Sequence, residues 1–170
     1  SLAPRINAAG RLGKTEFAVQ LMMTEDRTVA DQMAQTLCDL NAKRQAMEQE
    51  IWADAVKMVE GQPAGTPIVL ASDHWHKGIV GITASRLAEQ FNVPSVMICL
   101  DGEEGKGSCR SYGNFDLFAA LSACSEYLET FGGHALAAGL SIRKDELSDF
   151  RRALMEYYFR RPPDDTPDLQ

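Results

Sequence analysis

The sequence predicts an α/β protein, with a small mixed β-sheet that contains a βαβ unit, is flanked by helices and is preceded by a long connecting helix. Residues 26–60 contain neither glycine nor proline, and their apolar side chains recur at helical spacing. Two short apolar runs, at 67–71 and 95–100, enclose an amphipathic segment at 78–91. This strand–helix–strand order is typical of parallel strands joined by a right-handed crossover.

The first sixty residues are expected to carry a motif-bearing segment and two helices. Residues 1–15 are small and polar, which predicts an ordered loop or a short turn of helix. A short apolar helix follows at 16–23, and Thr24 is a suitable N-cap for the long helix after it. That helix would be about 50 Å long at 1.5 Å per residue. Its apolar stripe lacks sustained heptads, which favours a strut between two domains over a coiled coil.

The rest of the chain is expected to complete the sheet. A third strand at 106–112 should run antiparallel to the second, and Asn114 or Asp116 should cap a helix that reaches about residue 130. Gly132 and Gly133 are expected to stop that helix. A strand at 139–143 and a helix at 146–159 follow. The predicted domains are therefore a motif loop with a connecting helix (1–61), an α/β nucleic-acid-binding domain (62–160) and a disordered tail (161–170).

Charge and cysteine content narrow the class of protein. The formal net charge of −7 excludes a global basic field that binds nucleic acid by charge alone. Any such binding must use a local pocket or a partner domain outside this chain. The four cysteines are not spaced as a metal knuckle or a redox pair, which indicates reduced thiols in a cytoplasmic protein. No apolar run approaches the roughly 20 residues that span a bilayer, and no signal peptide is visible. The motif-like start indicates a fragment of a larger protein.

Three segments contain no acidic residue although the chain is acidic, and together they suggest an anion-binding pocket. Ser108 and Arg110 lie two apart on a predicted strand, so both should face one side and suit a phosphate, with Cys109 facing the core. The alternative for each segment is plain structure: surface charges, a solvent-facing strand or a helix C-cap. The candidate phosphate-binding residues are Arg5, Asn7 and Arg11 in segment 4–12, Ser108 and Arg110 in segment 107–111, and Gly132, Gly133 and His134 in segment 132–139.

The run from Asp73 to His76 resembles a metal site at the end of a strand, but no fourth ligand is evident nearby. We therefore predict no metal site in this chain. The run is expected to begin the next helix, in which Gly78 and Gly81 allow close approach to the sheet. His76 is expected to be a minor contact to a ligand or a partner domain.

Four motifs, in order, resemble the RecJ family of single-strand-specific DNA exonucleases, part of the DHH phosphoesterase superfamily. They are PRINAAGRL at 4–12, WHKGIVGITASRL at 75–87, GKGSCRS at 105–111 and GGHALAAGLSI at 132–142. The resemblance covers roughly residues 2–155. It implies a connecting helix and a DHH-associated domain, which act beside an N-terminal DHH domain that holds two metal ions, manganese or magnesium.

The resemblance also implies a function: part of a 5′–3′ exonuclease on single-stranded DNA in repair and recombination. Ser108, Arg110 and either Arg5 or Arg11 would hold the 5′ phosphate or a nearby one. Gly132, Gly133 and His134 would border the scissile phosphate, with His134 donating to its oxygens. The expected partners are single-stranded DNA and the DHH domain. The fragment has no cofactor of its own and should be inactive alone.

Two other functions stay open from the sequence. One is an oligoribonuclease or cyclic-dinucleotide phosphodiesterase of the same superfamily, which PRINAAGRL disfavours. The other is a non-catalytic module that binds nucleic acid or protein, with the methionines of the long helix as its docking surface.

Overall fold

The computed structural model describes residues 2–162 and divides into two compact units, residues 1–50 and 51–170. We call them the N-terminal unit and the sheet unit. The boundary between them falls inside α3 (Arg27–Val59), a single 33-residue helix that confirms the predicted long helix. The tail prediction concerns mainly residues 163–170, which lie outside the described residues.

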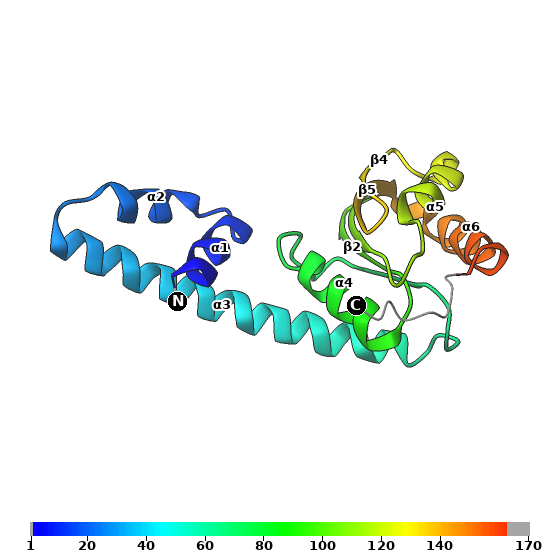
Figure 1. The fold of residues 1–170 in the computed structure, drawn as a ribbon, viewed down its shortest axis with the longest axis horizontal. Coiled ribbons are helices and arrows are strands. Elements are labelled where there is room, and N and C mark those ends of the chain that lie inside the picture. Colours follow the sequence, from blue (N-terminus) through cyan, green and yellow to red (C-terminus); the bar gives the residue numbers. More distant parts are fainter. Residues whose placement is uncertain (1, 163–170) are drawn as a thin grey trace. The chain divides into compact units, whose positions relative to one another are not determined.

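The N-terminal unit is helical throughout (Figure 1). Helix α1 (Ala3–Arg11) lies where a loop or a short turn was expected, so the loop alternative was wrong. A proline at the first helical positions suits a helix start, and Ala8 and Ala9 are fully buried. Helix α2 (Thr15–Met23) confirms the short apolar helix. The core of this unit is a small cluster of three buried residues, Ala9, Ala18 and Leu37. Partly buried apolar side chains surround it.

The cap of α3 differs from the prediction. The carboxylate of Asp26 accepts hydrogen bonds from the backbone N–H groups of Thr28 (2.8 Å) and Val29 (3.2 Å). The hydroxyl of Thr24 accepts instead from the backbone N–H of Asp26, at 3.2 Å. Thr24 therefore supports the capping residue and is not the cap, because it lies too far from the first turn.

The sheet unit is built on five strands in the order β1-β2-β3-β5-β4. Strands β1 (Ile68–Ser72) and β2 (Ser95–Asp101) are parallel and joined by α4 (Val80–Phe91), as the βαβ prediction required. Strands β3 (Glu104–Arg110), β5 (Ala137–Arg143) and β4 (Thr130–Gly133) add antiparallel neighbours. The sheet is therefore mixed and the α/β fold class is confirmed.

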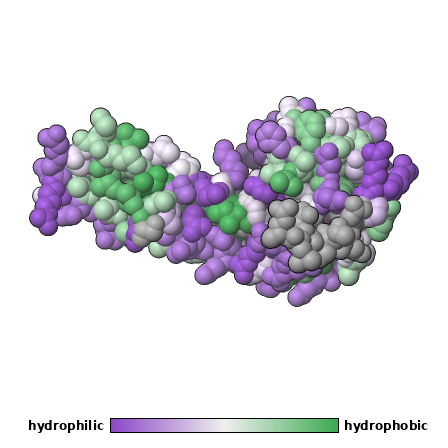
Figure 2. Space-filling view, viewed as in Figure 1, coloured by the Kyte–Doolittle hydropathy of each residue, from purple (hydrophilic) through white to green (hydrophobic). Residues whose placement is uncertain are grey.

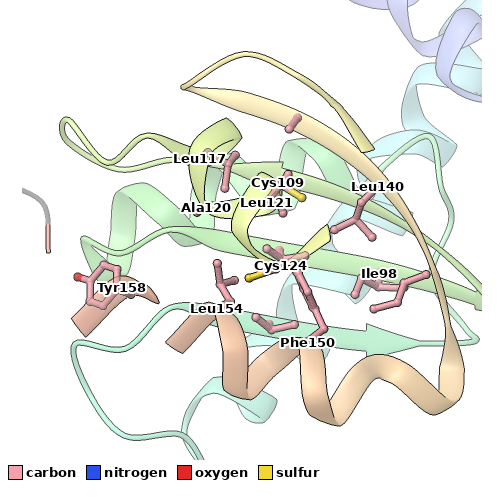
Figure 3. Packing of buried hydrophobic residues seen from close by; sticks show 14 of the residues in the cluster. Ile98, Cys109, Leu117, Ala120, Leu121, Cys124, Leu140, Phe150, Leu154 and Tyr158 are labelled. Atoms are coloured by element: carbon pink, nitrogen blue, oxygen red, sulfur yellow. The ribbon is translucent and has the colours of Figure 1, made fainter. Parts of the chain in front are cut away.

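Helices cover the two faces of the sheet unequally (Figure 1). Helix α4 packs on one face against β2 and β3. Helices α5 (Leu117–Ala123) and α6 (Leu147–Arg160) pack on the other, where they enclose the main core. Figure 3 shows that core, in which side chains from the sheet meet those from α5 and α6, among them Ile98, Cys109, Leu140, Leu121, Phe150 and Leu154.

The segment after Asp116 differs from the expected single helix. Asp116 is indeed the N-cap, accepting from the N–H of Ala119 at 2.9 Å. Helix α5 then ends at Ala123, and a 3₁₀ turn (Ser125–Tyr127) leads into β4. Gly132 and Gly133 therefore lie in a strand, and the prediction that they stop a helix was wrong. A four-residue strand with two glycines has no apolar alternation to reveal it.

Candidate functional site

Arg110 is held in place by α4. Its Nε donates to Ser85 Oγ at 3.0 Å, and its Nη1 donates to the carbonyl oxygen of Cys109 at 2.7 Å. Ser85 Oγ in turn donates to the carbonyl oxygen of Gly81 at 3.2 Å. The guanidinium is half-buried, and no carboxylate of the described residues lies within ion-pair distance of it. A fixed guanidinium without an acidic partner is suited to binding an external anion.

Ser108 lies beside Arg110, as strand alternation predicted. A Cβ placed on Gly81 would be 3.1 Å from Arg110 Nη2 and 3.5 Å from Ser108 Oγ, so both side chains reach the same glycine of α4. Cys109 between them is fully buried on the core side. Burial raises the pKa of the Cys109 thiol to about 12 although Arg110 is adjacent, so the thiol is neutral and leaves the guanidinium charge intact.

Two glycines extend this site across the sheet. Ser108 pairs with Gly139 on β5, and Gly139 pairs with Gly132 on β4, so the three lie in one cross-strand row. Both glycines are exposed. A Cβ on Gly132 would meet nothing within 4 Å, and one on Gly139 would meet only the carbonyl oxygen of Gly107, at 3.7 Å. Neither has a positive φ.

The structure therefore gives no internal reason for glycine at these two positions. Glycine weakens a strand, and its presence there often marks close approach by a ligand or another backbone. By contrast, Gly133 has a φ of 146°, and its Cβ would lie 2.4 Å from the carbonyl oxygen of Ala137. The hairpin itself requires Gly133, so only Gly132 and Gly139 are left for an external molecule.

His134 begins the short connection from β4 to β5. Three backbone hydrogen bonds fix that connection: His134 N–H to Ala137 at 2.8 Å, Leu117 N–H to Ala135 at 3.0 Å, and Ser111 N–H to Leu136 at 2.9 Å. The residue is exposed, and its ring makes no hydrogen bond to another described residue. The imidazole is thus presented by a rigid loop that is tied both to the end of β3 and to the start of α5.

The remaining phosphate-binding candidates, Arg5, Asn7 and Arg11, lie on α1 in the N-terminal unit. Asn7 and Arg11 are four residues apart, which places them on one face of the helix, and both are exposed. Arg5 points to a different face and is half-buried. The sequence left open whether Arg5 or Arg11 binds phosphate, and the structure places the two arginines on different faces of α1.

The segment Asp73–His76 is organised by hydrogen bonds of its own. Trp75 is 7% exposed, and its Nε1 donates to Asp54 Oδ2 on α3 at 2.7 Å. His76 Nδ1 accepts from the N–H of Gly78 at 3.1 Å, at the start of the crossover to α4. His76 also lines a cavity of about 400 Å³ at the carboxyl ends of β1 and β2, with Lys77, Cys99 and Lys106 among its neighbours.

The described side chains do not assemble a metal-binding group. Among residues 2–162, no group of three or more His, Cys, Asp or Glu side chains could hold a metal ion. The residues present thus do not fit a resident metal centre. Within the same residues, no helix is both long and apolar enough to cross a membrane.

Sequence reasoning missed Ser85, and it expected Gly81 to approach the sheet closely without connecting it to Arg110. Both lie on α4 and contact Arg110 across 25 or more residues of sequence. The available signal was a glycine and a serine four residues apart in an amphipathic helix pattern, which places them on one helix face.

Comparison with known proteins places this geometry in a family. Residues 64–159 match the DHHA1 domain family. The single-stranded-DNA-specific exonuclease RecJ of Bacillus subtilis is 42% identical over 158 residues, which are 91% of this chain and 20% of the relative. The crystal structure of RecJ from Thermus thermophilus in complex with Mg²⁺ matches with a TM-score of 0.87 and 34% identity, covering 95% of this chain and 25% of that one.

The Mn²⁺ complex of the same Thermus protein matches similarly, with a TM-score of 0.86, 33% identity, and coverage of 95% of this chain and 24% of that one. The chain thus spans a fifth to a quarter of the length of these proteins. The matched family covers more than half of the chain. The chain therefore belongs to the DHHA1 domain family, and it is similar in sequence and fold to the corresponding part of RecJ proteins.

Proposed function

We propose that this chain is the substrate-binding part of a RecJ-type 5′–3′ exonuclease on single-stranded DNA, acting in repair and recombination in the cytoplasm. The observation that carries the proposal is the guanidinium of Arg110, fixed by Ser85 beside Ser108 and open to an anion. The relatives named as single-stranded-DNA-specific exonucleases support the choice of ligand. Four free cysteines suit a reducing compartment.

In this proposal the strand crosses the uncovered part of the sheet. Arg110 and Ser108 hold the 5′ phosphate, and an arginine of α1 binds a phosphate of the same strand. The next phosphate lies over Gly132 and Gly139, where bare backbone permits close approach. His134 donates a hydrogen bond to its oxygens and so stabilises charge that develops there. A local site of this kind is compatible with a net charge of −7.

In this proposal the metal ions are bound outside this chain. The described residues offer no metal-binding group, so the two-metal chemistry would come from a DHH domain of the parent protein, with manganese or magnesium. The chain alone would then be inactive. Nuclease activity in a pure preparation of the chain with Mn²⁺ would contradict the proposal that the DHH domain supplies the metal site.

A surface for that DHH domain is available on the N-terminal unit. Helix α2 exposes Val19, Met22 and Met23, which are 58%, 65% and 78% accessible. Figure 2 shows apolar side chains gathered over this unit. Exposed apolar clusters of this kind mark interaction sites, and methionine adapts to a partner surface.

The decisive test uses the intact protein that contains this chain, without divalent metal so that the strand stays uncut. Binding of a fluorescent single strand with or without a 5′ phosphate is measured for wild type, Arg110→Ala and Arg110→Lys. Arg110→Ala is expected to cost about 1–3 kcal/mol and to abolish the preference for the phosphate. The control Arg152→Ala removes an exposed arginine of α6, on the other face of the sheet, and should change neither. Unchanged affinity and unchanged preference in Arg110→Ala would remove the site.

A further inference from the structure

Tyr112 is an aromatic residue without an internal role, two positions after Arg110. It is 36% exposed and is not among the residues that form or border the main core. Among residues 2–162, its side chain has no hydrogen-bond or ring partner. Phe115, only three residues later, packs instead against Tyr157 and Tyr158, with ring centroids 6.1 and 5.5 Å apart.

The backbone hydrogen bonds around Tyr112 place this residue directly after the end of β3. The N–H of Ser111 donates to the carbonyl oxygen of Leu136 at 2.9 Å, which continues the β3–β5 ladder one pair beyond Arg110. Ser111 Oγ donates to the carbonyl oxygen of Phe115, a residue of the core on the α5 and α6 side. Strand β3 itself ends at Arg110, so Tyr112 is the second residue beyond the end of the strand that carries Arg110 and Ser108.

The separation of Tyr112 from Arg110 suits a single nucleotide. Two residues of chain span at most about 7 Å, so Arg110 and Tyr112 are close enough to contact the same nucleotide. The ring also stands on a fixed backbone, because the N–H of Phe115 donates to the carbonyl oxygen of Tyr112 at 3.3 Å. Only the side chain of Tyr112 must therefore be ordered on binding, which limits the entropic cost.

We propose that Tyr112 forms a nucleobase subsite, in which its ring stacks on the base of the 5′-terminal nucleotide whose phosphate Arg110 holds. The inference rests on the proposed function, because the phosphate at Arg110 sets the position of the base. Every base presents a π-face, so the subsite accepts all four bases. A strand with a base at this position binds more tightly than a strand without one. Arg110 thus binds the terminal phosphate, and Tyr112 stacks on the terminal base.

The test combines Tyr112 variants with strands that lack the first base. The intact protein is titrated, without divalent metal, with 5′-phosphorylated single strands that carry either a normal base or an abasic residue at the first position. For wild type, loss of that base should weaken binding roughly 5- to 140-fold, as for one base–aromatic stack. Tyr112→Ala should weaken binding of the normal strand by a similar factor and be insensitive to the abasic change. Tyr112→Phe should behave as wild type.

A matched control is Phe159→Ala, which removes a 61% exposed aromatic residue from α6 on the other face of the sheet and should retain full base dependence. A Tyr112→Ala protein that discriminates against the abasic strand as strongly as wild type does would overturn the subsite. Arg110→Ala in the same series separates the two proposals. If it weakens binding while Tyr112→Ala does not, only the base subsite fails; if it has no effect, the proposed phosphate site fails too.

Discussion

Arg110 on β3 and Ser85 on α4 are joined by a 3.0 Å hydrogen bond from the guanidinium Nε to the serine oxygen. The same serine donates to the carbonyl oxygen of Gly81 one turn earlier in the helix. The bond uses one guanidinium edge, so the orientation of the group is fixed before any ligand arrives. Preorganisation of this kind lowers the entropic cost of binding an anion.

Ser85→Ala is expected to loosen Arg110 without removing its charge. Affinity for a 5′-phosphorylated strand should fall by about 1 kcal/mol, less than in Arg110→Ala, because the charge remains but must be ordered on binding. Ser85→Thr restores a hydroxyl and should recover most of the loss. Calorimetric titration of the intact protein checks this. Equal losses in the alanine and threonine variants would show that the hydroxyl has no positioning role.

Gly81→Ala should separate stability from binding. Alanine is favoured over glycine in a helix by about 1 kcal/mol, so the melting temperature should hold or rise. The new Cβ would lie 3.1 Å from Arg110 Nη2 and would displace the flexible end of that side chain. We therefore expect weaker binding of the 5′ phosphate in a protein at least as stable as wild type. A loss of both properties would indicate that α4 itself has moved.

Gly139→Ala tests whether the exposed glycine row approaches a ligand. The added Cβ meets only a backbone oxygen at 3.7 Å, so thermal stability should not fall. Strand affinity should fall, because the methyl group occupies the space that a phosphate or sugar would fill. The contrasting variant is Gly107→Ala, whose Cβ would lie 2.9 Å from Leu140 Cδ1 in the core and should lower the melting temperature. Wild-type affinity in Gly139→Ala would place the strand elsewhere.

His134→Ala is expected to affect rate more than affinity. A donor that acts on charge developing at the scissile phosphate contributes mainly to the transition state, and losing one such donor costs roughly 10²-fold in kcat. Single-turnover cleavage by the intact protein with Mn²⁺, beside binding without metal, resolves the two effects. A loss confined to affinity would make His134 a positioning residue for the strand.

The sheet unit could be predicted wherever side-chain periodicity reports on burial. The βαβ unit followed from two apolar runs around an amphipathic segment, and the shared face of Ser108 and Arg110 followed from strand alternation. Strand β4 could not be predicted, because two of its four residues are glycine and the only local signal, a glycine pair, also marks helix ends.

The partners of Arg110 were beyond sequence reasoning for a different reason. The hydrogen bond to Ser85 and the contact at Gly81 depend on how α4 lies across β3, which no local pattern specifies. The same holds for the row from Ser108 to Gly132, because β4 and β5 enter the sheet in reversed order. Local patterns identified the polar residues, whereas the register of the sheet decides which of them meet.

Cys109 provides a pH-dependent test of the packing that supports the site. Its thiol has a pKa of about 12 in the folded protein because of burial, against an ordinary value of 9.0. The folded state therefore holds its proton between these values while the unfolded chain loses it. The resulting contribution to stability is complete below pH 9.0 and is lost progressively as pH rises toward 12.

Urea unfolding at about pH 8 and about pH 10.5, on either side of the ordinary thiol pKa, measures this loss. Wild type should lose stability between the two, and Cys109→Ala should lose less, although its stability at the lower pH is reduced because a buried side chain is truncated. The loss of stability that remains in Cys109→Ala comes from other groups, including Cys99 and Cys124, whose pKa values burial raises to about 11. If Cys109→Ala lost as much unfolding free energy between the two pH values as wild type does, the thiol would be hydrated in the folded protein. The core beneath Ser108 and Arg110 would then be looser than the packing of β3 against α5 and α6 requires.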